Sequence, residues 1–293
     1  MKKGSSRVDR FVFRDRHYYV KRDDLIDPLL SGNKYRKLYS LIQTPAETYH
    51  RIVSYGGTQS NAMLSIAALC QKKEWEFHYT SKPIPQYLKK KPTGNLKMAL
   101  EMGMQLHEVT ADDYEKEVGL LKSKAGDSSL FVPQGGADAL AQTGIDQLAK
   151  EIHQWQLKNR IEKLNVVTPS GTGTTAYYLA AALPDVAVLT THSVGDKAYL
   201  IQQMEVLGAK PVNLRILQNE KKHHFAKPYA EFFEIYRELK HAGIEFDLIY
   251  ATHMWHTLLQ HVESIEGTLL YVHSGGLIGN ETMLDRYHHK GLC

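Results

Sequence analysis

Residues 32–38 of the sequence, Gly-Asn-Lys-Tyr-Arg-Lys-Leu, place Lys34 directly after a Gly-Asn turn. A lysine amine fixed in this way can form an imine with an aldehyde. When the stretch is taken alone, the simpler interpretation is that Lys34, Arg36 and Lys37 form the exposed face of a helix start. Lys34 is therefore a candidate nucleophile that needs support from other parts of the chain.

A second stretch, residues 170–175, reads Ser-Gly-Thr-Gly-Thr-Thr and joins a predicted strand to a predicted helix. Backbone N–H groups at a helix start carry partial positive charge, so this turn can hold a phosphate. An ordinary tight turn is the alternative. No Gly-Lys-Ser/Thr follows as in a Walker loop, and Gly-x-Gly-x-x-Gly is incomplete, which disfavours ATP and NAD.

A third stretch, residues 56–61, reads Gly-Gly-Thr-Gln-Ser-Asn and also leads into a predicted helix. Its amides and side chains suit a carboxylate at the helix N-terminus, while plain N-capping by Thr58 or Ser60 is an equal alternative.

Histidine is frequent, and two pairs are adjacent, His223–His224 and His288–His289. Adjacent histidines point apart on a helix or a strand, and no cysteine or carboxylate stands at ligand spacing. We therefore expect surface histidines and no metal site. His253 and His256 follow Tyr250 closely and are expected either to border a cleft or to have a structural role.

The composition describes an ordinary globular protein. The chain has 293 residues, 43% of them hydrophobic and 23% charged, with a formal net charge of +4. This length is typical of about two domains. The densest basic cluster, residues 89–91, stands beside a proline and is expected to be a solvated turn, which argues against nucleic-acid binding.

Cysteine usage and hydropathy indicate the compartment. Cys70, expected to be core filler, and Cys293 are the two cysteines, so a disulfide framework is not expected and a reducing compartment is favoured. No segment approaches the ~20 apolar residues of a membrane span, and no apolar run of signal-peptide length follows the N-terminus. We expect a cytoplasmic protein without a membrane partner.

From residue 51 onward, short apolar runs alternate with longer helical patterns. This alternation predicts an α/β fold with mostly parallel sheets and helices on both faces. Strands are expected at residues 51–54, 76–80, 106–109, 130–132, 165–169, 186–190, 212–217 and 269–273. Helices are expected at residues 61–70, 95–102, 144–157, 174–183 and 229–241. One further helix is expected to start near residue 111, and another is expected to end near residue 207.

The joint order of these motifs resembles one family, the pyridoxal 5′-phosphate (PLP) dependent enzymes of the 1-aminocyclopropane-1-carboxylate (ACC) deaminase and D-cysteine desulfhydrase group. The resemblance covers nearly the whole chain, at residues 21–25, 32–38, 56–61, 94–95, 170–175 and 273–276. It implies the two-domain fold type II, similar to the tryptophan synthase β subunit. The large domain would comprise residues 1–37 and 134–293, the small domain residues 38–133, and PLP would lie between them.

The resemblance also implies roles for individual residues. Lys34 would hold PLP in Schiff-base linkage, Asn61 would contact the 3′-oxygen of the ring, and Tyr250 would act in catalysis. Ser60 would bind the substrate carboxylate or transfer a proton, with Gln59 and Asn61 as further substrate contacts. The phosphate would be held by Gly171, Thr172, Gly173, Thr174 and Thr175.

Two positions depart from the family pattern. Ala251 stands where the family has Glu or Thr against the ring nitrogen, and Thr252 or a serine near Gly275 are the replacements within reach. Phe225 stands where the family has another active-site tyrosine, with Tyr229 nearby. A tryptophan-containing segment typical of true ACC deaminases has no counterpart. ACC deamination is thus disfavoured.

We expect a homodimeric PLP-dependent lyase that releases ammonia from a small amino acid, first of all D-cysteine, with sulfide and a 2-oxo acid as co-products. ACC deamination, β-replacement and racemisation are the alternatives that retain PLP. A protein that binds PLP or an amino acid with little turnover is the alternative from another class.

Overall fold

An N-terminal hairpin and four further strands form the larger of two sheets in this computed structural model, which describes residues 4–30, 32–123, 126, 128–136 and 139–293. The strand order is β1-β2-β10-β7-β8-β9. β1 and β2 pair antiparallel, and the other neighbours pair parallel. The bounds are β1 Val8–Phe13, β2 Arg16–Lys21, β7 Leu164–Val167, β8 Ala187–Thr191, β9 Leu214–Leu217 and β10 Thr268–Val272.

The smaller sheet is parallel throughout and has the strand order β5-β4-β3-β6. Its strands are β3 Arg51–Tyr55, β4 Glu76–Ser81, β5 Met104–Glu108 and β6 Ser129–Phe131. The helices between them are α3 Asn61–Lys73, α4 Gln86–Lys90, α5 Gly94–Glu101 and α6 Tyr114–Ser123. The predicted alternation of strands and helices and the α/β fold class are confirmed, while the exact domain boundaries at residues 38 and 133 stay a prediction.

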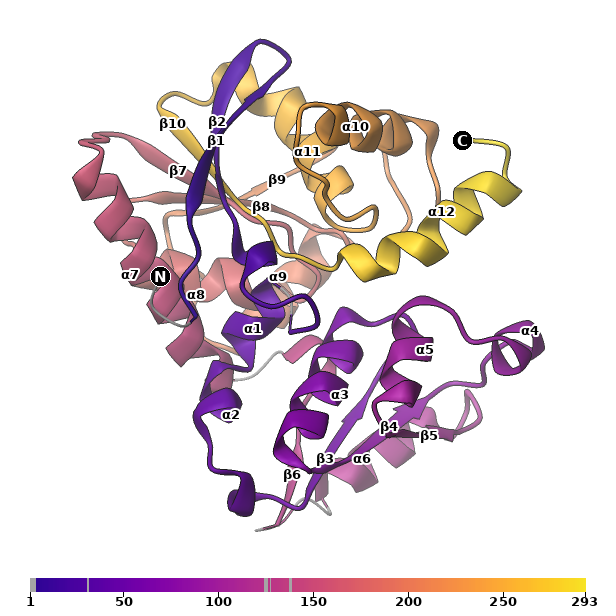
Figure 1. Ribbon diagram of the computed structural model, residues 1–293. Helices are drawn as coiled ribbons and strands as arrows, with labels where there is room; N and C mark the ends of the chain where they lie inside the picture. Colours follow the sequence, from indigo (N-terminus) through magenta and orange to yellow (C-terminus); the bar gives the residue numbers. More distant parts are fainter. Residues whose placement is uncertain (1–3, 31, 124–125, 127, 137–138) are drawn as a thin grey trace.

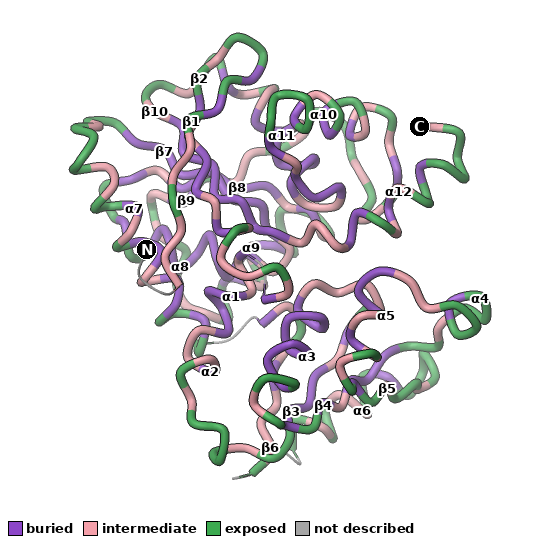
Figure 2. Tube along the Cα trace, in the orientation of Figure 1, coloured by how far each residue is buried: buried purple, intermediate pink, exposed green. Residues whose placement is uncertain are grey.

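Helices cover both faces of the larger sheet (Figure 1) because successive strand residues point to opposite sides. Val166 and Val188 pack into one hydrophobic core with three helices, and Val167 and Leu189 pack into another with two. Figure 2 shows these strands buried and the rim exposed. The first core contains α7 Gln142–Lys158, α8 Thr174–Ala182 and α9 Lys197–Glu205; the second contains α10 Ala230–His241 and α11 Ala251–His261.

Three further helices complete the described chain: α1 Asn33–Lys37 and α2 Tyr39–Gln43 follow the N-terminal hairpin, and α12 Asn280–His289 follows β10. In Figure 1, α1 lies between the two sheets. The helix is only five residues long, so its placement depends on contacts with the rest of the molecule.

A buried ion network supplies those contacts. The Arg36 side chain is inaccessible to solvent and donates to both carboxylate oxygens of Asp23, at 2.8 and 2.9 Å, and to both of Glu151, at the same two distances. Lys21 Nζ donates to Glu151 Oε2 at 2.6 Å. In addition, a Cβ at Gly144 of α7 would lie 1.9 Å from the Arg36 carbonyl oxygen, so only glycine permits this packing. The network thus attaches α1 to both β2 and α7.

The expectation that Cys70 is core filler is confirmed. Cys70 of α3 is a free cysteine, buried in the hydrophobic core that packs against the smaller sheet. Residues 89–91 are accessible to solvent as expected, but residues 89 and 90 belong to helix α4 and not to a turn. Lys89 pairs with Glu108 across 2.7 Å. Within the described ranges, no helix is both long and apolar enough to cross a membrane.

We predict that Arg36→Leu lowers the free energy of unfolding by roughly 3–5 kcal/mol, because it leaves Asp23 with an uncompensated buried charge. Arg51→Ala is the matched control. It breaks a pair with Glu76 in which both side chains are about half exposed, and it should cost at most about 1 kcal/mol. Urea denaturation followed by circular dichroism measures both changes. Equal effects of the two substitutions would show that the network does not stabilise the fold.

Candidate active site

Lys34 lies in the first turn of α1, and its amine is enclosed although the side chain as a whole is only half-buried. Burial lowers the pKa of this amine to about 8, against a smaller opposing effect of the Asp247 charge. A neutral amine is the nucleophilic form. The simpler interpretation of residues 34–37 as an exposed face is wrong, because Arg36 and Lys37 are both buried.

The turn at residues 170–175, called the phosphate turn below, joins β7 to α8. Ser170 is held from two sides: its hydroxyl accepts a hydrogen bond from Thr190 Oγ1 at 2.7 Å, and its carbonyl accepts from Ser193 N at 2.9 Å. Gly173 has φ of +77°, a conformation that favours glycine. Thr175 Oγ1 is buried and has no hydrogen-bond partner among the described residues, which fits a hydroxyl that donates to a phosphate oxygen.

Tyr250 faces the phosphate turn from the start of α11. A Cβ at Gly171 would lie 3.2 Å from Tyr250 Cε1, so the absence of a side chain at residue 171 lets the phenol approach. Asp247 fixes this end of the helix by accepting hydrogen bonds from the backbone N–H groups of residues 249, 250 and 251 at 2.6–3.2 Å. Burial raises the pKa of Tyr250, which therefore stays neutral and able to donate.

The N-terminus of α3 carries the predicted substrate contacts. Ser60 caps the helix by accepting a hydrogen bond from Met63 N at 3.3 Å, as the capping alternative predicts. The Gln59 side chain is held between the Thr93 carbonyl and Asn95 N, at 3.1 and 3.0 Å. Asn61 Oδ1 accepts from Asn95 Nδ2 at 2.8 Å. The polar side chains of this turn are therefore held by α5 and its N-terminal flank.

Several close approaches bring these segments together. A Cβ at Gly276 would lie 2.4 Å from the Asn61 side chain, and Asn33 N donates to the Ser274 carbonyl at 3.2 Å. The residues after β10 therefore contact both the α3 turn and the start of α1. A Cβ at Gly135 would lie 3.5 Å from Thr172 of the phosphate turn. The predicted site residues thus converge from both sheets.

Two small hollows border this arrangement. One is lined by Phe225 and Ile249, beside Tyr250, and the other by Asn61 and Gly276. Neither is lined by Lys34.

Two buried residues were not among the predicted site residues. Lys37 Nζ donates to the Gly135 carbonyl at 3.0 Å, next to the phosphate turn, and burial followed by the charge of Lys34 lowers its pKa well below the usual range. Burial raises the pKa of Asp247 to about 6. The sequence could have indicated Lys37 as a site residue, because it stands three residues after Lys34 and residues three apart on a helix lie on one side. For Asp247 the only indication in the sequence was its place before a helix.

At positions 251 and 225 the chain lacks the residues that the family pattern has. The structure shows whether the neighbouring Thr252 and Tyr229 are placed to replace them. Ala251 is fully buried, and the Thr252 hydroxyl donates to the Leu248 carbonyl at 3.1 Å, so this hydroxyl is engaged within its own helix. The Phe225 ring lies 5.5 Å from the Tyr250 ring between centroids. The Tyr229 hydroxyl accepts from His224 N at 2.9 Å, and the Tyr229 ring packs on His223, so it does not take the place of Phe225.

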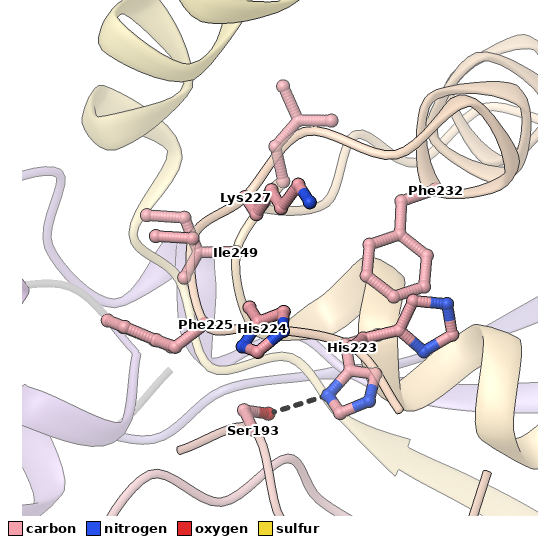
Figure 3. A pocket seen from close by; sticks show the side chains of 10 residues that line it. Ser193, His223, His224, Phe225, Lys227, Phe232 and Ile249 are labelled. Atoms are coloured by element: carbon pink, nitrogen blue, oxygen red, sulfur yellow. Dashed lines mark hydrogen bonds between the residues drawn. The ribbon is translucent and has the colours of Figure 1, made fainter. Parts of the chain in front are cut away.

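The histidine expectations hold in part. His224, His288 and His289 are exposed, but the His223 side chain is only 4% accessible to solvent and pairs with Glu231 at 3.0 Å, so its expected surface position is wrong. Figure 3 shows His223 and its neighbours around the hollow beside Tyr250. No group of three or more metal-ligating side chains occurs within the part of the chain that the structure describes.

Comparison of the sequence with known protein families identifies the family to which the chain belongs. Residues 7–231 match the family described as pyridoxal-phosphate dependent enzyme, so the chain belongs to that family and its cofactor is PLP. The lowered pKa of Lys34 and the Thr175 hydroxyl, which lacks a hydrogen-bond partner among the described residues, fit this cofactor.

Two relatives of this chain have names that state particular activities. A Thermotoga maritima protein named as a candidate 1-aminocyclopropane-1-carboxylate deaminase is 28% identical over 288 residues, 89% of each chain. The mitochondrial bifunctional D-cysteine desulfhydrase/1-aminocyclopropane-1-carboxylate deaminase of Arabidopsis thaliana is 26% identical over 298 residues, which cover 92% of this chain and 74% of that one.

Solved structures share the fold. An ACC deaminase homologue superposes with a TM-score of 0.77 at 19% identity and covers 96% of this chain and 94% of its own. Serine racemase from Dictyostelium discoideum superposes with a TM-score of 0.66 at 12% identity, covering 93% and 92%. These likenesses confirm the predicted PLP fold type II.

We predict that the cofactor-free protein captures added PLP faster as pH rises, with half of the maximal rate near pH 8. The amine pKa of about 8 makes half of Lys34 neutral at that pH, whereas an ordinary lysine would need a pH near 10.5. Stopped-flow absorbance measures the rate, and Lys34→Ala is the control that should show no covalent capture. A midpoint near 10.5 would contradict the enclosed position of this amine.

Proposed function

We propose that the protein is a PLP-dependent lyase that releases ammonia from a small amino acid carrying a leaving group at its β-carbon. D-Cysteine is the first candidate, with sulfide and a 2-oxo acid as co-products. The observation that supports the proposal is the lowered pKa of Lys34, near Asp247, together with the close approach of Tyr250 to Gly171 of the phosphate turn. The two relatives named for ACC deamination and D-cysteine desulfhydration support the same class of reaction.

Lys34 is proposed to hold PLP and to move the substrate α-proton. PLP supplies an electron sink when it is bound. Because its pKa is about 8, the Lys34 amine is neutral often enough near pH 7 to act as a base. Residues 171–175 and Asn61 are proposed to contact the cofactor. Lys37 adds a buried amine beside Gly135, next to the phosphate turn, and this amine can donate a hydrogen bond to a phosphate oxygen.

The α3 turn is proposed to bind the substrate carboxylate. It presents the N-terminal N–H groups of a 13-residue helix together with Gln59, Ser60 and Asn61. Ser60 also serves as the helix cap, so its hydroxyl oxygen already accepts one backbone hydrogen. The α5 contacts to Gln59 and Asn61 hold the turn in one arrangement before substrate binds.

Tyr250 is proposed to donate its phenolic hydrogen to the leaving group. Its raised pKa keeps that hydrogen in place at neutral pH. Phe225 contributes a ring at 5.5 Å but no second hydroxyl. This favours expulsion of a group such as a thiol, which leaves readily, over opening of a cyclopropane ring.

ACC deamination, β-replacement and racemisation remain the alternatives on the same cofactor, and a binding protein with little turnover is the alternative outside lyase chemistry.

We also propose that the large domain comprises residues 1–37 and 134–293 and the small domain residues 38–133. The protein is further proposed to be a homodimer with a cytoplasmic location. The free cysteines Cys70 and Cys293 support a reducing compartment.

We predict that the purified protein absorbs in the visible range and releases pyruvate, ammonia and sulfide from D-cysteine. Lys34→Ala should abolish turnover, and Tyr250→Phe should lower kcat by roughly 10²-fold or more, because a positioned proton donor is lost. A screen of D- and L-amino acids with detection of 2-oxo acids makes the measurement. Bound PLP without any 2-oxo acid product would favour the binding protein, and an inverted amino acid would favour racemisation.

A further inference from the structure

His253 lies on α11 three residues after Tyr250, and its side chain is buried between two loops of the larger sheet. One loop follows β8 and carries Ser193; the other follows β9, spans residues 218–229 and carries Asn219 and Phe225. The mechanism proposed above assigns no role to this imidazole. Both of its nitrogens nevertheless have hydrogen-bond partners.

The partners determine which nitrogen carries the hydrogen. Asn219 Nδ2 is an amide donor, so His253 Nε2 accepts from it. His253 Nδ1 therefore carries the hydrogen and donates to Ser193 Oγ at 3.3 Å. Burial, followed by the neighbouring imidazoles of His223, His192 and His256, lowers the pKa of His253 to about 3. The imidazole stays neutral, and this pattern of donors and acceptors persists at physiological pH.

Each partner leads to a different part of the candidate active site. Ser193 N donates to the Ser170 carbonyl at 2.9 Å, so Ser193 is bonded directly to the start of the phosphate turn. Because Ser193 Oγ accepts the histidine hydrogen, its own hydrogen is directed away from His253. Asn219 anchors the loop that carries Phe225, whose ring packs on Tyr250.

A threonine completes the arrangement. Thr257 Oγ1, one turn further along α11, lies 2.8 Å from both Asn219 Oδ1 and the His253 carbonyl oxygen. Asn219 is thereby held at both ends of its side-chain amide. The Asn219 loop is attached to α11 at two successive turns of the helix.

We propose that His253 is a positioning residue that holds the phosphate turn and the Phe225 loop in fixed register with the helix of Tyr250. Its Nδ1 side acts through Ser193 on cofactor binding, and its Nε2 side acts through Asn219 on the wall beside the substrate. This inference rests on the proposed function for its substrate arm only, since PLP binding belongs to the family.

Three substitutions of His253 distinguish the contribution of its Ser193 contact from that of its Asn219 contact. His253→Phe removes both hydrogen bonds. His253→Asn offers an amide donor at the place of Nδ1 and so retains the Ser193 contact, whereas His253→Gln offers an acceptor at the place of Nε2 and so retains the Asn219 contact. His256→Gln is the matched control on the same helix, because His256 contacts Gln260 at a solvent-accessible position.

The readouts are the PLP dissociation constant of the full chain, measured by titration without substrate, and kcat and KM for D-cysteine. We expect His253→Phe to weaken PLP binding roughly tenfold and to raise KM by a similar factor, the effect of one lost hydrogen bond on each side. His253→Asn should restore PLP binding but not KM, and His253→Gln should restore KM but not PLP binding. His256→Gln should change neither.

A purely structural role would lower the unfolding temperature of the His253 variants and leave PLP affinity and KM unchanged, which would overturn the proposal. Equal effects of His253→Asn and His253→Gln on both constants would overturn it as well. If His253→Phe does not fold, the proposal is still tested by His253→Asn and His253→Gln, because these two variants are expected to have opposite effects on PLP binding and on KM. If D-cysteine is not turned over, the proposed function fails, and the PLP titration alone tests the Ser193 side.

Discussion

The buried guanidinium of Arg36 is the contact on which the placement of Lys34 depends. A five-residue helix has no stability of its own, and the charge of Arg36 is compensated only where Asp23 and Glu151 meet it. Because Asp23 follows β2 and Glu151 belongs to α7, the position of α1 depends on its contacts with the larger sheet and with the first helix that covers it. Lys34, two residues before Arg36, is then held near Asp247 and Lys37.

The same principle recurs around the site: two of the short functional turns are held by partners from another part of the chain, and the third is held by a residue just before it. Ser170 is held by the end of β8, the α3 turn by Asn95 of α5, and the start of α11 by its own Asp247. Such turns are ordered before any ligand binds, which lowers the entropy that binding must overcome. The Thr175 hydroxyl, for which the described part of the chain offers no hydrogen-bond partner, is an exception that fits a ligand atom.

Much of this could be predicted from local pattern. Short apolar runs between helical patterns placed the strands from β3 to β10 close to their observed bounds, and glycine next to hydroxyl residues marked both turns that we propose to bind ligands. The hairpin β1–β2 was not predicted, and charged Arg36 and Lys37 resembled a surface face by composition alone. Their burial depends on partners such as Glu151, 115 residues away from Arg36, and no local pattern contains that information. His223 was misplaced for the same reason, because its partners Glu231 and Phe232 enclose it only in the folded chain.

The most direct test of this account is the position of the covalent link to PLP. Borohydride reduction of the protein with bound PLP, followed by proteolysis and mass spectrometry, identifies the lysine that carries the cofactor. We predict the modification at Lys34 and not at Lys37, although both amines are enclosed and only three residues apart. Modification at Lys37, at another lysine or at none would contradict the central claim that α1 presents Lys34 to the cofactor.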